Sequence, residues 1–281
     1  MKALVRIAAA VILCIAPFRI FAVVLGVTDN SNQYSNVGFI ATGNGTLASG
    51  VLIAPNVILT AAHVVEQHNL NPNSFFRTGV DAFSSPDQTI SISGSGLIDP
   101  LYSPITLFHD IGLLFLDSPI VLPSSTLLWA KPSAELLGIA GTMAGYGFNN
   151  VGHTTGLGTR RTGVSNVVSA TDTLLTIGIP ALAPGDSGGG LFVDTPQGRV
   201  LAGINSFVAN GGGGSTISGF ISVSAAKDFI DMNTSGVNWY GVTASSVPEP
   251  LPITFFAAGL LTVVVTRRSK HSLVHPSKTR A

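Results

Sequence analysis

The sequence predicts an all-β protein, built as a barrel or a sandwich, and three observations lead to this fold class. Its 281 residues are enough for one large domain or two small ones. Hydrophobic residues make up 46% of the chain and charged residues 10%, so a packed core is expected. The 32 glycines and 16 prolines indicate many turns, and short apolar runs between turns are typical of strands.

The first strands are expected between Val37 and Val65, where the pattern is strand-like throughout. Val37–Ala41 and Ser49–Ala54 are apolar runs, and the Asn44-Gly45 pair between them is typical of a hairpin turn. The next run covers Asn56–Thr60. Further strands are expected at Thr89–Ser93, Ile111–Leu116, Ile139–Ala144, Leu174–Ile179, Leu191–Val193, Val200–Ser206 and Gly219–Val223.

One helix is expected, at Ser224–Met232. Phe229 and Ile230 lie on one side of this segment, while Lys227 and Asp228 lie on the other. This separation is typical of a helix that covers a core.

Residues 1–22 are predicted to be a signal peptide. Lys2 and Arg6 form a basic start, Ile7–Phe18 is apolar, and Ala22 is a cleavage position; an uncleaved anchor helix is the alternative. The single cysteine, Cys14, lies inside the apolar run. The mature protein would therefore contain no disulfide, no cysteine–metal site and no cysteine nucleophile.

The charge distribution argues against nucleic acid as a partner. All 14 acidic residues and only six of the 14 basic ones lie between Asp29 and Glu249, so this body carries 6 − 14 = −8. The remaining basic residues lie near the two ends, beside apolar runs. No group of His, Asp and Glu has the spacing of metal ligands, so neither a metal nor an organic cofactor is expected.

The C-terminal part resembles the PEP-CTERM sorting signal of Gram-negative bacteria. A linker over residues 238–250 ends in Val247-Pro-Glu-Pro250, and the segment 251–281 begins with the apolar run Leu251–Thr266, followed by Arg267-Arg268. The resemblance implies transient membrane insertion and processing by an exosortase-type enzyme. A simple C-terminal membrane anchor is the alternative.

Three separated motifs carry residues for acyl-transfer chemistry. His63 follows the apolar strand ending in Leu59-Thr60-Ala61-Ala62, and Asp110 directly precedes the apolar run Ile111–Leu116. Ser187 lies in Pro184-Gly-Asp-Ser-Gly-Gly-Gly190. A serine hydroxyl needs a base, a group that orients the base, and donors for the oxyanion, and these motifs supply those parts.

In the order His, Asp, Ser, the motifs resemble those of the chymotrypsin–trypsin family, over Val23 to Asn233. The resemblance implies a protease domain over residues 23–237, with two packed antiparallel β-barrels and a short C-terminal helix. It also implies that His63, Asp110 and Ser187 form the catalytic triad. The backbone N–H groups of Gly185 and Ser187 would form the oxyanion hole, and Ser206 matches the position that hydrogen-bonds the aspartate.

The same resemblance implies a substrate pocket. Ala181 would form its base, Phe207 and Val208 one wall beside Ser206, and Gly219 the opposite wall. With no aspartate at the base, a buried Lys or Arg would lack a counter-charge. A small or medium apolar residue before the cut is therefore expected.

Activation is expected to follow from export. In the family a new N-terminal amine pairs with the aspartate before the nucleophile, which is Asp186 here. Val23-Val-Leu-Gly26 follows the expected signal cleavage and resembles the family's apolar N-terminus, although Leu25 stands where glycine is usual. Val64 stands where the family commonly has a cysteine.

These observations predict an exported serine endopeptidase that acts on proteins or peptides. It would be membrane-anchored before C-terminal processing and extracellular or on the cell surface afterwards. One alternative is a non-catalytic surface or adhesion protein on a protease scaffold. Another is an esterase-like hydrolase that uses the same triad.

Overall fold

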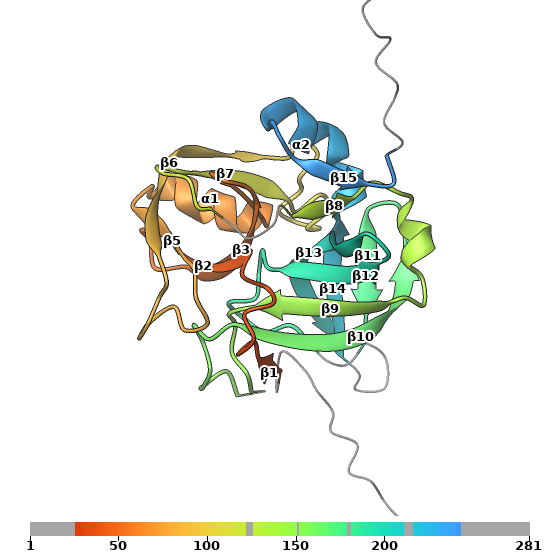
Figure 1. Cartoon of the computed structure of the whole chain (residues 1–281), viewed down its shortest axis with the longest axis horizontal. Coiled ribbons are helices and arrows are strands. Elements are labelled where there is room, and N and C mark those ends of the chain that lie inside the picture. The colour runs from red at the N-terminus through yellow and green to blue at the C-terminus, as the bar shows by residue number, and fades with distance from the viewer. Residues whose placement is uncertain (1–25, 122–125, 151, 179–180, 211–215, 243–281) are drawn as a thin grey trace, which may run out of the picture. The chain divides into compact units, whose positions relative to one another are not determined.

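The computed structural model describes residues 26–121, 126–150, 152–178, 181–210 and 216–242. Two closed antiparallel barrels of six strands lie side by side in this part of the chain (Figure 1). This architecture confirms the expected all-β fold of two packed barrels with a short C-terminal helix. The expected signal peptide at 1–22, the linker from residue 243 onward and the apolar run at 251–266 lie outside the described residues.

The first barrel has the strand order β2-β3-β4-β7-β6-β5. Its strands are β2 (Val37–Ala41), β3 (Leu47–Ala54), β4 (Val57–Thr60), β5 (Ser74–Arg77), β6 (Thr89–Ile98) and β7 (Gly112–Leu116). The hairpin predicted at Asn44-Gly45 joins β2 to β3, and Gly45 adopts a φ of 88° there. The strands β2 and β4 are buried along their whole length, which explains why they are continuous apolar runs.

The second barrel has the order β9-β10-β11-β14-β13-β12 and closes through pairing of β12 with β9. Its strands are β9 (Ala140–Gly145), β10 (Arg161–Ala170), β11 (Leu174–Ile177), β12 (Gly190–Thr195), β13 (Gly198–Asn210) and β14 (Thr216–Ser222). Outside the barrel, β1 (Val27–Thr28) pairs with β10. The parallel pair β8 (Leu127–Trp129) and β15 (Asn238–Tyr240) extends from β13. The linker expected from residue 238 therefore begins with a strand of the folded unit.

The helical segments differ from expectation at one important place. The strand-like pattern assigned through Val65 is wrong, because helix α1 (Ala62–Leu70) begins directly after β4. Ala62, Val64 and Val65 are buried against the first barrel, so an apolar run here indicates a packed helix and not a strand. Near the end of the described residues, the 3-10 turn η3 (Val223–Ala226) leads into α2 (Lys227–Asn233), in agreement with the expected helix. Another 3-10 turn, η1 (Ser133–Leu136), lies between β8 and β9.

Several strands had no clear sequence signal. β10 alternates between buried and exposed side chains and carries polar residues, and β5, β8 and β15 have only three or four residues each. Among the described residues no helix has the length and apolar character needed to cross a membrane.

Candidate active site

His63 lies in the first turn of α1, at the end of the first barrel. The buried Ala61 and Ala62 let the chain turn from β4 into the helix without filling the space around the imidazole. The ring remains 29% exposed. The backbone N–H of His63 donates to Oδ1 of Asp110 over 2.9 Å, and the ring Nδ1 lies 2.8 Å from Oδ2 of the same carboxylate. An ionised carboxylate only accepts, so this contact assigns the proton to Nδ1 and leaves Nε2 free to accept one.

Asp110 is fully buried, directly before β7. Besides the two donors of His63, the Ser206 hydroxyl donates to Oδ2 of Asp110 over 2.5 Å. Three donors on one carboxylate satisfy the requirement that a buried charge be paired and hydrogen-bonded. His63, Asp110 and Ser206 therefore form one hydrogen-bonded group that spans the first barrel and β13 of the second.

A second buried His–Asp pair supports the turn before Asp110. His109 adopts a φ of 51°, which is uncommon for a residue with a side chain. Its Nδ1 lies 2.9 Å from Oδ2 of Asp99, and both side chains are buried. This pair, which the sequence analysis did not identify, holds the strained residue next to Asp110.

Ser187 lies on a loop that packs against the first barrel. Gly188 adopts a φ of 81°, and a Cβ at this position would lie 1.9 Å from Oγ1 of Thr60, at the end of β4. The Ser49 backbone N–H donates to the Ser187 carbonyl over 2.8 Å. The loop around Ser187 (residues 184–190), called the Ser187 loop below, is thereby held beside the segment that leads into His63.

The Ser187 hydroxyl and the two expected oxyanion donors have no hydrogen-bond partners among the described residues. The Ser187 hydroxyl makes no hydrogen bond to the His63 ring, and the N–H groups of Gly185 and Ser187 have no acceptor within the described ranges. Gly185 adopts a φ of 95°, and a Cβ there would lie 2.9 Å from the Cα of Gly147, so glycine is required. Two backbone donors next to a serine hydroxyl are thus available to an incoming ligand.

Asp186 is buried on the opposite side of this loop. Its carboxylate accepts from the Gly147 N–H over 2.8 Å and from the Ala183 N–H over 2.9 Å. Burial raises the pKa of Asp186 to about 7, although these two donors and the charge of Arg161 act in the opposite direction. Gly145 and Gly147 lie against the carboxylate, where a Cβ would clash with it. The Gly-Tyr-Gly sequence at 145–147 was the signal for this contact, and the sequence analysis missed it.

Ser49 is another residue that the sequence analysis did not identify. Its fully buried hydroxyl donates to the Gly185 carbonyl over 2.8 Å and accepts from the Tyr146 N–H over 2.9 Å. One side chain of β3 therefore links both the Ser187 loop and the residue that follows β9 to the first barrel. No local pattern reveals this role, since Ser49 and Gly185 are 136 positions apart.

A cavity of about 400 Å³ opens beside Ser187. Three of the expected pocket residues, Ser206, Phe207 and Val208, line it, whereas Ala181 and Gly219 do not. Gly219 is paired with Phe207 across β13 and β14, and the Phe207 ring occupies the space where a Gly219 side chain would lie. The other lining residues, not expected from the sequence, are His153, Leu182, Ala183 and Pro184.

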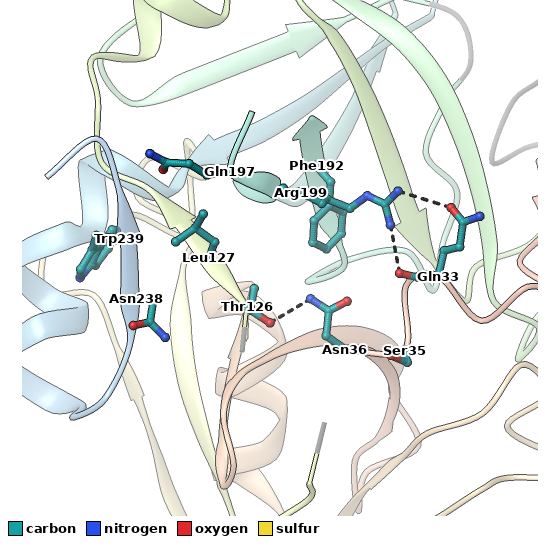
Figure 2. Close-up of a pocket in the computed structure, with 11 residues that line it drawn as sticks. Gln33, Ser35, Asn36, Thr126, Leu127, Phe192, Gln197, Arg199, Asn238 and Trp239 are labelled. Carbon is teal, nitrogen blue, oxygen red and sulfur yellow. Dashed lines mark hydrogen bonds between the residues drawn. The ribbon is translucent and has the colours of Figure 1, made fainter. Parts of the chain in front are cut away.

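A second cavity, of about 540 Å³, is separate from these residues (Figure 2). Arg199 donates to the backbone carbonyl and side chain of Gln33, and Asn36 donates to Thr126, along its wall. None of the described residues that line it has a carboxylate or an imidazole, so these residues offer no general base for acyl transfer. Within the described ranges, no three His, Cys, Asp or Glu residues are grouped closely enough to hold a metal ion.

Comparison with known proteins identifies the family. The trypsin family model matches residues 23–230, which is well over half of the chain. Human granzyme M is 36% identical over 115 residues, a match that covers 39% of this chain and 43% of granzyme M. The chain thus aligns with less than half the length of this relative. On the family-model match and the paired barrels, the chain belongs to the trypsin family of serine peptidases.

Proposed function

We propose that the protein is a serine endopeptidase in which Ser187 is the nucleophile, His63 the general base and Asp110 the residue that orients the base. The observation that carries the proposal is the buried Asp110 carboxylate, which binds both the backbone N–H and Nδ1 of His63. This contact leaves Nε2 as the only ring nitrogen able to take a proton. Contacts of a catalytic serine are often long before the substrate binds, so the missing Ser187–His63 hydrogen bond is compatible with this role.

The reaction then proceeds in two acyl-transfer steps. Ser187 Oγ attacks the scissile carbonyl carbon while its proton passes to Nε2 of His63. The negative charge that develops on the carbonyl oxygen is stabilised by the N–H groups of Gly185 and Ser187. His63 gives the proton to the leaving amine as the C–N bond breaks. A water molecule, deprotonated by the same nitrogen, then hydrolyses the acyl-enzyme and restores the Ser187 hydroxyl.

We further propose that the residue before the cut is small or medium-sized and apolar. The side chains that line the cavity include Leu182, Pro184, Phe207 and Val208, and no carboxylate is among them. A Lys or Arg side chain placed there would lose its hydration without gaining a counter-charge. Ala181, which was expected at the base of the pocket, and Gly219, which was expected as the opposite wall, do not line this cavity.

The proposed activation pairs the amine of Val23 with Asp186. Val23 lies outside the described residues, but Val27 pairs with Thr162 of β10, and the neighbouring Arg161 pairs with Gly145, which lies against the Asp186 carboxylate. The four-residue step from Val27 back to Val23 can span roughly 13 Å when extended. Asp186 forms no ion pair within the described ranges, and an ammonium group beside it would supply a direct counter-charge to the buried carboxylate.

Export and surface release complete the proposal. They depend on the signal peptide at 1–22 and on processing at Pro248-Glu249-Pro250 by an exosortase-type enzyme, with transient membrane insertion through 251–266. Mass spectrometry of the protein recovered outside the cell tests both. We expect ends at Val23 and near Pro250, and a recovered product that retains residues 1–22 and 251–281 would contradict export with processing.

The proposed chemistry is tested on protein that is expressed from the whole chain, purified and shown to begin at Val23, by labelling with a fluorophosphonate probe. We expect modification confined to Ser187, no modification of Ser187→Ala, and hydrolysis of peptide substrates by the parent protein only. A folded, N-terminally processed parent that is neither labelled nor active would indicate a non-catalytic scaffold. Hydrolysis of esters without hydrolysis of any peptide in the panel would indicate an esterase instead.

A further inference from the structure

Asn205 is a buried amide in the middle of an apolar strand. Its neighbours on β13, Ala202 and Ile204, belong to the core, and Asn205 itself is 0% exposed. Its side-chain Oδ1 is buried without a hydrogen-bond partner among the described residues. Burying an amide with an unpaired oxygen costs stability, so its remaining contacts must offset that cost or serve another purpose.

Those contacts converge on the loop that carries Ser187. Asn205 Nδ2 donates to the carbonyl of Asp186 over 3.0 Å and to that of Ala144 over 3.3 Å. The Asn205 N–H donates to the Gly189 carbonyl over 2.8 Å, and its carbonyl accepts from the Gly188 N–H over 2.8 Å. One residue thus contacts the loop on both sides of Ser187.

The contact with the Asp186 carbonyl determines where the N–H of Ser187 points. These two groups belong to one peptide unit, which is planar and trans, so that C=O and N–H point in opposite directions. Asn205 Nδ2 and the Gly189 N–H, 2.9 Å away, both hold the carbonyl on the interior side of the loop. The Ser187 N–H is consequently directed away from the interior, and it has no acceptor in the described part of the chain.

We propose that Asn205 is a positioning residue that keeps the Ser187 N–H available as an oxyanion donor. The inference rests on the proposed function, because it assigns a support to the donor used in that reaction. Without the Asn205 amide, the Gly189 N–H would be the one remaining donor, among the described residues, that holds the Asp186 carbonyl inward. Rotation of the peptide unit would then turn a carbonyl oxygen towards the developing oxyanion and remove a donor.

The test compares an ester substrate with the matching thionoester, in which sulfur replaces the carbonyl oxygen. Sulfur is a weak acceptor, so acylation by the thionoester depends less on the oxyanion donors. In the processed protein that begins at Val23, Asn205→Leu keeps the shape of the side chain and removes its donors. We expect its kcat for the ester to fall roughly 10- to 100-fold. This is less than the roughly 100- to 1,000-fold fall that follows complete removal of an oxyanion donor, because the Ser187 N–H is displaced for only part of the time. KM should change little, and the ester-to-thionoester rate ratio should fall about tenfold.

A matched control is Ser222→Ala, which removes a buried polar side chain from the same barrel. The described hydrogen bonds of the Ser222 hydroxyl are to Ser133 and Ser224 and not to the Ser187 loop. This variant should lose stability but keep the parent rate ratio. If Asn205→Leu does not fold, Asn205→Ser serves instead, because its shorter side chain cannot reach the Asp186 carbonyl; the same fall in the ratio is expected.

The two proposals fail in different ways. A parent protein that is active and labelled at Ser187, together with an unchanged rate ratio in a folded Asn205 variant, would overturn the role of Asn205 alone. A folded, processed parent that is not labelled would overturn the proposed function and this inference with it.

Discussion

Replacing Asp110 by Asn tests the hydrogen bonds that we propose orient His63 as the general base, with almost no change of side-chain shape. The carboxylate accepts at Oδ1 from the His63 backbone N–H and at Oδ2 from Nδ1 of His63 and the Ser206 hydroxyl. A carboxamide has only one oxygen. If its NH₂ group takes the Oδ2 position, it donates to Nδ1, and the ring must carry its proton on Nε2. His63 then cannot accept the proton of Ser187.

The opposite orientation of the amide is also unfavourable. Its oxygen would then accept from Nδ1, but its NH₂ group would face the His63 backbone N–H, two donors about 2.9 Å apart. We therefore expect the wrong tautomer to dominate and kcat to fall about 10⁴-fold, as for the equivalent change in a serine protease. At 1.36 kcal/mol per factor of ten, this is about 5.5 kcal/mol of lost transition-state stabilisation.

The assay is the rate of peptide hydrolysis together with the rate of fluorophosphonate labelling, on protein shown to be folded. Asp99→Asn is the matched control, because it changes the other buried His–Asp pair in the same region, Asp99–His109. We expect Asp99→Asn to keep kcat within about tenfold of the parent, since Asp99 contacts neither His63 nor Ser187. A folded Asp110→Asn protein with kcat within tenfold of the parent would refute the assigned role of Asp110.

The remaining predictions concern stability and specificity. In protein that has not been cleaved before Val23, and so has no amine to pair with Asp186, burial raises the pKa of Asp186 to about 7, above its ordinary value of 3.8. Its contribution to stability is therefore fully present below about pH 4 and is lost as the pH rises to about 7, a change on the order of 4 kcal/mol. Urea unfolding between pH 4 and 8 should show this loss in the parent but not in Asp186→Asn, and parallel curves would contradict it. Arg160→Met should lower the free energy of unfolding by about 3–5 kcal/mol, because the buried Asp29 carboxylate would lose the guanidinium 3.0 Å away. Adding Asp29→Asn to Arg160→Met should restore part of that loss. If the free energy of unfolding of Arg160→Met lies within 1 kcal/mol of the parent value, about the effect of an average point mutation, the Arg160–Asp29 pair has no structural role. Val208→Gly should enlarge the cavity and shift the preferred residue before the cut towards larger apolar side chains. A peptide library measures this preference, and an unchanged profile would remove Val208 from the specificity determinants.

The strands that sequence analysis located share a physical cause. In β2, in β4 and over residues 190–193 of β12, all residues are buried, because one face points into a barrel and the other is covered by neighbouring elements. Such strands appear as continuous apolar runs between turn residues. β10 was missed because much of one face is exposed, and α1 was misassigned because its buried Ala62, Val64 and Val65 resemble a strand.

The sequence by itself predicted which residues would carry the chemistry of the candidate site. His63, Asp110 and Ser187 each stand in a local motif, and their order along the chain resembles that of one family. The structure adds that His63 and Asp110 are in hydrogen-bond contact, and that the Ser187 loop packs against the strand leading to His63.

Only the tertiary structure decided which residues support that site and which line its cavity. Ser49 reaches a carbonyl 136 positions away, and Asn205 reaches one 19 positions away, contacts that no short pattern encodes. Gly219 was expected on the cavity wall, but the ring of Phe207 covers it. The local pattern of apolar residues indicates whether a side chain is buried. Which residue that side chain contacts depends on how the two barrels close and pack, and this packing is a property of the whole chain.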